Sequence, residues 1–172
     1  ISVIAGDNVI LDGSNRAGLF ADRNVGTGKS VTVNGYTISG ADAANYSLVQ
    51  PTGVTADITA LSLAVTGVTA SDKIYDRSRA AVLFGGAIAP LGGDDVILDS
   101  SAAAGLFADK NVGVAKAVTA TGFALTGADA LNYAIVQPSG MTANITVRSL
   151  AVTGVQVANK TSDGNVTATL SG

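Results

Sequence analysis

Aspartate is the residue in this chain with the widest capacity for chemistry. All thirteen acidic residues are aspartates, and their carboxylate oxygens are hard ligands of the kind that Ca²⁺ prefers. Asp94, Asp95 and Asp99 lie within one short stretch and are weak candidates for a calcium site, as are Asp7 and Asp12. No Asp-x-Asp-x-Asp-Gly loop is present. We therefore favour the alternative that these carboxylates support turns and strand ends.

The composition offers little for catalysis. Histidine, cysteine and glutamate are absent, so the usual general bases and nucleophile pairs cannot be assembled. Apart from the calcium candidates, we expect no metal, no cofactor and no enzyme activity. The loops Asp22-Arg23-Asn24 and Asp109-Lys110-Asn111 are candidates for binding a ligand, but Asp and Asn more often support a turn by bonding to the backbone.

The charge pattern argues against nucleic acid as a partner. The net charge is −3, and there is neither a basic stripe nor much aromatic surface for stacking bases. No apolar run reaches transmembrane length, so we expect no direct insertion into a membrane. The chain begins at Ile1, without methionine and in the middle of a pattern, and we interpret it as an internal fragment.

A repeated turn-and-strand segment positions the polar residues. ADAANYSLVQP, around Tyr46, occurs again as ADALNYAIVQP, around Tyr133, 87 residues later. An aspartate and then a tyrosine just before an alternating strand resemble the tyrosine corner of immunoglobulin-like sandwiches, in which the phenol packs inward and its hydroxyl bonds to backbone. We therefore predict structural roles for Tyr46, Tyr133, Asp42 and Asp129, with both tyrosines largely buried.

The same offset relates the rest of the chain. Residues 1–60 and 88–147 are identical at 35 of 60 positions without an insertion, which indicates a tandem duplication. The favoured division is the later part of one repeat (1–60), a complete repeat (61–147) and the start of a third (148–172). The alternative phase places folded units at 1–85 and 88–172.

The strand pattern predicts the fold class. Val, Ile, Thr and Gly are plentiful, and about seven short strands separated by turns fit each copy, with no clear helix. We predict an all-β chain of tandem immunoglobulin-like β-sandwich repeats of 87 residues. Another small, mostly-β repeat, such as a β-grasp-like unit, is the alternative. Because the repeats join with almost no linker, we expect them to form a stiff rod.

Several blocks carry a family resemblance. LSLAVTG, Lys-x-Tyr-Asp, GGDDV and GLFADKNVG occur in order in the complete copy, and SGADAxNY and TADIT occur in the copy before it; together they resemble the YDG/MBG repeats of very large bacterial surface proteins. These include filamentous-haemagglutinin-like adhesins exported by two-partner secretion. The name motif Tyr-Asp-Gly departs from its pattern in both copies, as Tyr75-Asp76-Arg77 and Ser162-Asp163-Gly164. We interpret the motif as a structural turn.

The resemblance implies an extracellular spacer that projects distal binding regions from a bacterial surface. Its implied partners are the neighbouring repeats of the same chain. The alternative function is direct adhesion, in which loops or a strand edge bind a glycan or a host surface protein. We also expect the half-unit 1–60 to be completed, either by residues 148–172 of a neighbouring molecule or by the chain folding back on itself.

Overall fold

The computed structural model describes residues 1–172 and confirms the predicted all-β class. Its strands form several sheets, consistent with a β-sandwich-like fold, and its helical content is two short 3-10 turns. None of these turns is long and apolar enough to cross a membrane. The chain divides into two compact units, which do not follow the 87-residue repeat.

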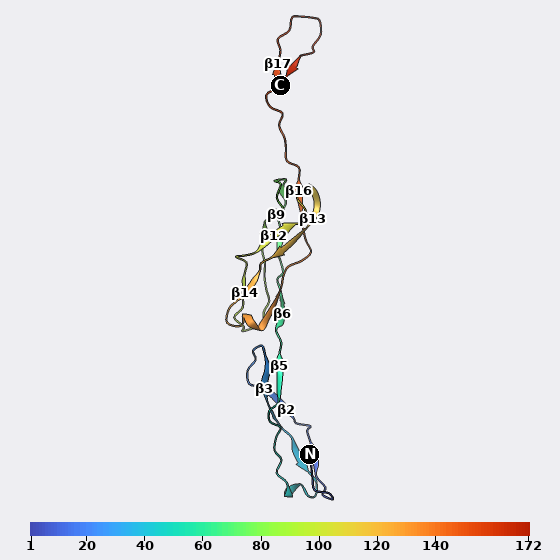
Figure 1. Ribbon diagram of the computed structural model, residues 1–172, viewed down its shortest axis with the longest axis vertical. Coiled ribbons are helices and arrows are strands. Elements are labelled where there is room, and N and C mark those ends of the chain that lie inside the picture. Colours follow the sequence, from blue (N-terminus) through green and yellow to red (C-terminus); the bar gives the residue numbers. More distant parts are fainter. The chain divides into compact units, whose positions relative to one another are not determined.

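The first unit contains residues 1–68, 85–103 and 121–139. Its three-stranded sheet has the order β2-β3-β5, and these strands are labelled in Figure 1. Three two-stranded pairs are β1-β4, β11-β14 and β15-β6. Its elements are β1 Ile10–Asp12, β2 Ala17–Phe20, β3 Gly26–Asn34, β4 Thr37–Ser39, the 3-10 turn η1 Ala43–Asn45, β5 Thr55–Ile58, β6 Leu61–Ala64, β11 Ile97–Asp99, β14 Ala124–Thr126, η2 Ala130–Asn132 and β15 Tyr133–Val136.

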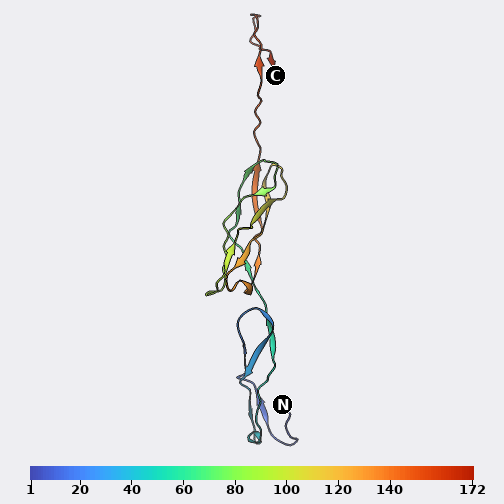
Figure 2. The same cartoon turned by 60° about the vertical axis from the view of Figure 1, so that its left-hand side comes forward.

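The second unit contains residues 69–84, 104–120 and 140–172. Its main sheet is five-stranded, in the order β8-β16-β13-β12-β9, and two short pairs are β10-β7 and β17-β18. Figure 2 shows β17 and β18 in red. Its elements are β7 Thr69–Ala70, β8 Lys73–Ile74, β9 Ala80–Ala81, β10 Leu83–Phe84, β12 Ala104–Phe107, β13 Gly113–Thr121, β16 Met141–Thr146, β17 Gln156–Val157 and β18 Leu170–Ser171.

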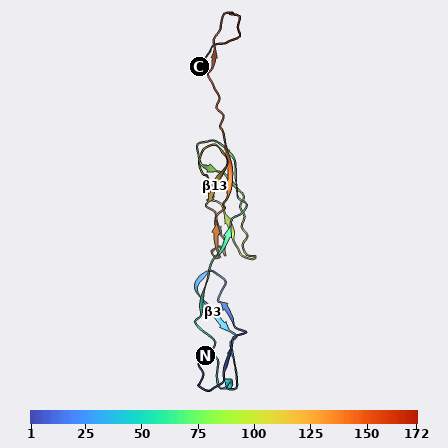
Figure 3. The same ribbon diagram turned by 90° about the vertical axis from the view of Figure 1, so that its right-hand side faces the viewer.

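The duplication is visible in the backbone. Figure 3 labels β3 and β13, which are the nine-residue strands at equivalent positions of the two copies. Each is followed by a break at a glycine in the left-handed region, Gly35 and Gly122. A side chain at Gly122 is excluded by space as well, because its Cβ would lie 2.1 Å from the carbonyl oxygen of Ala102. A glycine is therefore required for the chain to leave β13 and enter β14.

The copies differ in burial although they share their strands. In the complete copy, β6 pairs in parallel with β15, and Leu63 and Val65 are only 5% and 4% exposed. The second unit buries Phe107 and Ile145 completely. No residue of 1–60 is buried, although β2, β3 and β5 pair as β12, β13 and β16 do. The core is therefore built where residues 61–85 contribute strands, and 1–60 lacks an equivalent contribution.

This difference predicts unequal effects of one substitution made in the two copies. Phe107→Ala should destabilise the folded chain by about 3–5 kcal/mol, because a fully buried ring leaves a cavity. Phe20→Ala, at the equivalent position, should cost distinctly less because its ring is partly exposed. Urea unfolding followed by circular dichroism measures both values. Equal losses of unfolding free energy would show that the two copies have equivalent cores.

Candidate inter-repeat interface

The tyrosine of the complete copy organises a polar network. Tyr133 is buried, and its hydroxyl donates to Oδ2 of Asp94 at 2.7 Å and accepts from the backbone amide of Leu91 at 2.9 Å. The hydroxyl therefore joins β15 to a loop about forty residues earlier in the sequence. This bond to distant backbone differs from the local bond of an immunoglobulin tyrosine corner.

The first copy has the same pair of bonds. The Tyr46 hydroxyl donates to Asp7 at 2.6 Å and accepts from the amide of Ile4 at 2.9 Å. Tyr46 is only half-buried, in contrast to its buried equivalent. The polar network thus forms without the covering strand, whereas complete burial of the ring does not.

Asp42 and Asp129 close the turn that precedes each tyrosine. The Asp129 carboxylate accepts from the amide of Asp95 at 2.9 Å, and the Asp42 carboxylate accepts from the amide of Asn8 at 2.8 Å. Each aspartate also donates its own amide to the carbonyl of the same partner. Two strands distant in sequence are thereby held together at equivalent places in both copies.

Arg23, from the first copy, reaches this network in the second copy. Its Nη1 donates to Oδ1 of Asp94 at 2.6 Å, and its Nη2 donates to Oδ1 of Asp129 at 3.0 Å. Asp94 is the carboxylate that accepts from Tyr133, and Asp129 is the carboxylate that closes the turn before Tyr133. The guanidinium fork suits two separate carboxylate acceptors, which a lysine ammonium would engage only as a point charge. Arg23 therefore links the two repeats through groups that already have structural roles.

Neighbouring residues of the same loop add hydrogen bonds. The amide of Val25 donates to Oδ1 of Asn132 at 2.9 Å, and Nδ2 of Asn132 donates to Asn24 at 3.1 Å. Asp22 holds the loop in shape by accepting from the amide of Asn24 and from Lys29. The loop 22–25, which we call the clasp loop, is therefore fixed by its own aspartate while it binds the next repeat.

The electrostatics of the network favour its charged form. Donation from the Tyr133 hydroxyl, followed by the Arg23 guanidinium, lowers the pKa of Asp94. Burial, followed by its bond to Asp94, raises the pKa of Tyr133. The ion pair with Asp94 raises the pKa of Arg23. At neutral pH the network therefore contains one carboxylate shared by a neutral phenol and a guanidinium cation.

A small cavity lies beside the clasp loop. Its volume is about 200 Å³, below the roughly 300–1,000 Å³ typical of small-molecule sites. Both apolar and polar side chains line it, among them Val25, Ile58, Leu61, Leu91 and Tyr133. The interface is thus better suited to packing two repeats than to enclosing a ligand.

The calcium candidates serve as hydrogen-bond acceptors. Asp94 binds Tyr133 and Arg23, whereas Asp95 accepts from the amide of Ala128 at 3.1 Å. Asp99 accepts from the amide of Ser101 at 2.8 Å, as expected of an aspartate in a turn. The structure brings no three acidic side chains together in a geometry that would hold a metal ion.

The Tyr-Asp-Gly motif position is a strained turn in this chain. Arg77 has φ of 71°, and Gly164 has φ of 76° at the same place in the third copy. Only glycine adopts this left-handed conformation freely. Lys73 lies beneath the turn and donates to Asp76 at 2.8 Å and to the carbonyl of Ser78 at 2.9 Å. Its bond lowers the pKa of Asp76 to about 2.

Replacement of the strained residue should stabilise the fold. We expect Arg77→Gly to raise the free energy of unfolding by up to about 1 kcal/mol, because relief of a left-handed conformation exceeds the added freedom of the unfolded chain. Gly164→Arg, in the exposed third copy, is the matched reverse change. Urea unfolding measures the first, and a loss of stability in Arg77→Gly would contradict the strain argument.

The clasp loop should loosen when its cation or its acceptor is neutralised. Arg23→Ala should speed hydrogen exchange of the Val25 amide several-fold at neutral pH, whereas Lys110→Ala, at the equivalent position, should leave it unchanged.

The stability that the network gives should also depend on pH. Because the pKa of Asp94 is lowered in the folded chain, its stabilising contribution is complete above the unfolded value of about 3.9 and is lost as the pH falls below that value.

A nuclear magnetic resonance titration of the Val25 amide tests this pH dependence. We expect its bonded signal to disappear on acidification below about pH 4. Asp94→Asn should show the loosened signal already at neutral pH. If the Val25 amide keeps its bonded signal both on acidification and in Asp94→Asn, the role of the network is contradicted.

Comparison with known proteins corrects one expectation and supports another. The family model that matches is described as the YDG domain, and it covers residues 1–54 and 59–143. No curated protein and no solved structure matches the chain. The expected resemblance to adhesin repeats of the filamentous-haemagglutinin type is wrong: the match is to a YDG domain, and no comparison returns an adhesin. The chain belongs to the YDG-domain family.

Proposed function

We propose that this chain is a structural spacer, in which successive YDG-domain repeats are joined end to end by the clasp loop. The observation that carries the proposal is the double contact of Arg23 with Asp94 and Asp129 across the repeat boundary. Neighbouring repeats of the same chain are then the principal partners. The role requires no cofactor and no catalytic group.

The covalent join supports the same role. Strand β5 ends at Ile58 and β6 begins at Leu61, so only two residues separate the last strand of one copy from the first strand of the next. A join of two residues allows much less independent motion than a flexible linker does. Together with the clasp loop, it gives each boundary a covalent and a non-covalent connection.

An extracellular location forms part of this proposal. The chain has no cysteine and one methionine, so it offers few side chains to oxidation outside the cell. A spacer in that setting would hold other regions of a longer polypeptide away from their attachment point. Cell fractionation with an antibody against the repeat tests the location separately from the mechanical role.

The charge balance favours a spacer over a reader of DNA. The name YDG domain is also used for readers of methylated DNA. This chain carries a net charge of −3, whereas nucleic-acid surfaces gather unpaired cations. Half of its ten cationic side chains are in ion pairs with its own aspartates: Arg23, Lys29, Lys73, Lys116 and Lys160.

Small-angle X-ray scattering tests the spacer function. Chains of two, three and four tandem 87-residue copies should show a maximum dimension that rises linearly with copy number. Alanine in place of the clasp cation in each copy should broaden the distance distribution while leaving the fold of each copy intact. Compact particles whose dimension does not follow copy number would overturn the proposal, and selective binding on a glycan array would favour direct adhesion.

A further inference from the structure

One asparagine of the chain is followed directly by glycine. Asn34-Gly35 is the only such pair in the sequence. In this dipeptide the backbone nitrogen of the glycine can attack the side-chain carbonyl carbon of the asparagine, because no Cβ on the glycine hinders the approach. Asparagine is among the thermolabile residues of proteins. The pair is therefore a candidate site of spontaneous chemical modification.

The fold places this pair at the end of a strand. Asn34 is the last residue of β3 and pairs with Ala17, the first residue of β2, so it lies at the end of the β2-β3 ladder. Its side chain is exposed to solvent. The end of a ladder opens locally at little cost in free energy. Asn34 can therefore leave its extended conformation while the rest of the sheet stays folded.

The glycine of the pair cannot be replaced by a less reactive residue. Gly35 has φ of 83°, and a Cβ at this position would lie 2.1 Å from the carbonyl oxygen of Asn15. The complete copy requires a glycine at the same place, Gly122, but there the preceding residue is Thr121. The backbone thus fixes the second residue of the dipeptide in both copies and leaves the first free to vary. Threonine has no side-chain carbonyl for the glycine nitrogen to attack.

The exposure of Asn34 is a property of the repeat. Thr121 is exposed as well, although it lies in the copy whose core is complete. Both residues end a nine-residue strand, and the short strands that follow are paired alike, β4 with β1 and β14 with β11. Solvent therefore reaches this corner in both copies, and only the residue before the glycine distinguishes their reactivity.

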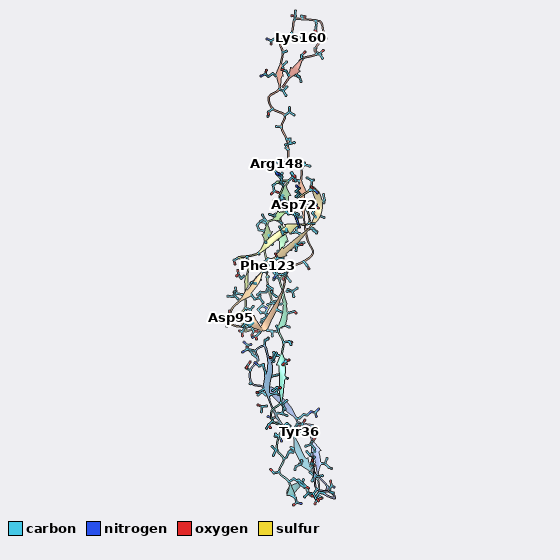
Figure 4. The ribbon with its side chains drawn as sticks, in the orientation of Figure 1. Tyr36, Asp72, Asp95, Phe123, Arg148 and Lys160 are labelled. Carbon is cyan, nitrogen blue, oxygen red and sulfur yellow. The ribbon has the colours of Figure 1, made fainter.

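A second reactive dipeptide in the same corner is protected. Asp12-Gly13 could form the same cyclic imide, and a Cβ on its glycine would lie 2.9 Å from the ring of Tyr36, which is labelled in Figure 4. However, the Asp12 carboxylate accepts from the amide of Ser14 at 2.8 Å and from its hydroxyl at 3.0 Å, and these bonds lower the pKa of Asp12. An ionised carboxylate is a poor electrophile, whereas the neutral side-chain amide of Asn34 remains open to attack.

We propose that Asn34 is a site of spontaneous deamidation through a cyclic imide. The Gly35 nitrogen loses its proton to hydroxide and bonds to Cγ of Asn34, and the side-chain nitrogen takes up a proton from water and leaves as ammonia. Water then opens either carbonyl of the imide, which gives aspartate or isoaspartate. Each product adds one negative charge to a chain of net charge −3. This inference does not depend on the spacer function.

Isoaspartate would alter the backbone where β3 leads into β4. It carries the main chain through the side-chain carboxyl and so adds one methylene between residues 34 and 35. The next residue is Tyr36, whose amide donates to Oε1 of Gln50 at 3.2 Å and whose carbonyl accepts from Nε2 of Gln50 at 2.8 Å. A longer backbone should disturb this two-point contact. We therefore expect the Tyr36 amide proton to exchange several-fold faster in molecules that carry isoaspartate.

Peptide mapping of the intact 172-residue chain after prolonged incubation at mildly alkaline pH tests this proposal. Mass spectrometry should find aspartate and isoaspartate at position 34, formed several-fold faster than at any other asparagine. The rate should rise with pH, because the attack requires removal of the Gly35 amide proton. Methylation by an isoaspartate-specific methyltransferase with S-adenosylmethionine measures isoaspartate independently of the mass.

Two matched variants make the test specific to the dipeptide. Asn34→Thr, which copies the residue of the complete repeat, should abolish the modification. Thr121→Asn should create a second site of similar rate before Gly122, in the copy whose core is complete. An unmodified Asn34 would overturn the proposal, as would aspartate without isoaspartate at position 34 or a Thr121→Asn variant that gains no second site.

Discussion

The parallel pairing of β6 with β15 is the interaction on which the rest of this structure depends. It places Leu63 and Val65 in the core and brings with them the following segment, whose strands β8 and β9 extend the five-stranded sheet of the second unit. Residues 1–60 share 35 of 60 positions with residues 88–147 and have no strand paired as β6 is, and none of them is buried. Shared strands therefore do not by themselves give the same core, because burial is a property of the whole set of strands.

The polar network around Tyr133 connects this core to the repeat boundary. Tyr133, the first residue of β15, is buried, and its hydroxyl donates to Oδ2 of Asp94, whose Oδ1 accepts from Arg23 of the preceding copy. A side chain that completes the fold of one repeat thus also prepares the acceptor for its neighbour. The contact between repeats therefore depends on folding of the second copy, since the acceptor Asp94 is held in place by the buried Tyr133.

Several features of the fold could be predicted from the sequence because they are local. The all-β class follows from strand propensity and turn residues. The sequence also predicts that the Tyr-Asp-Gly position is a turn, and the left-handed φ of Arg77 gives the physical reason for a glycine there.

The interface itself could not be predicted, because its partners are distant in the sequence. Arg23 and Asp94 are 71 positions apart, and the sequence suggested a turn or a ligand loop at one and a calcium ligand at the other. The one available signal was that the loop is the same in both copies except for its cation. The resemblance to adhesin repeats pointed to the YDG domain correctly but attached a source that the comparisons do not support.

Hydrogen exchange at two equivalent amides tests most directly the claim that the covering segment creates the core. Ala143 in β16 and Ala56 in β5 are equivalent residues of the two copies; each follows a threonine, and each pairs with the equivalent lysine of the strand beside it. At a dilution where the chain is monomeric, the Ala143 amide should exchange only by global opening. The Ala56 amide should exchange about a hundredfold faster or more, by local opening. Equal protection of the two amides would contradict the account.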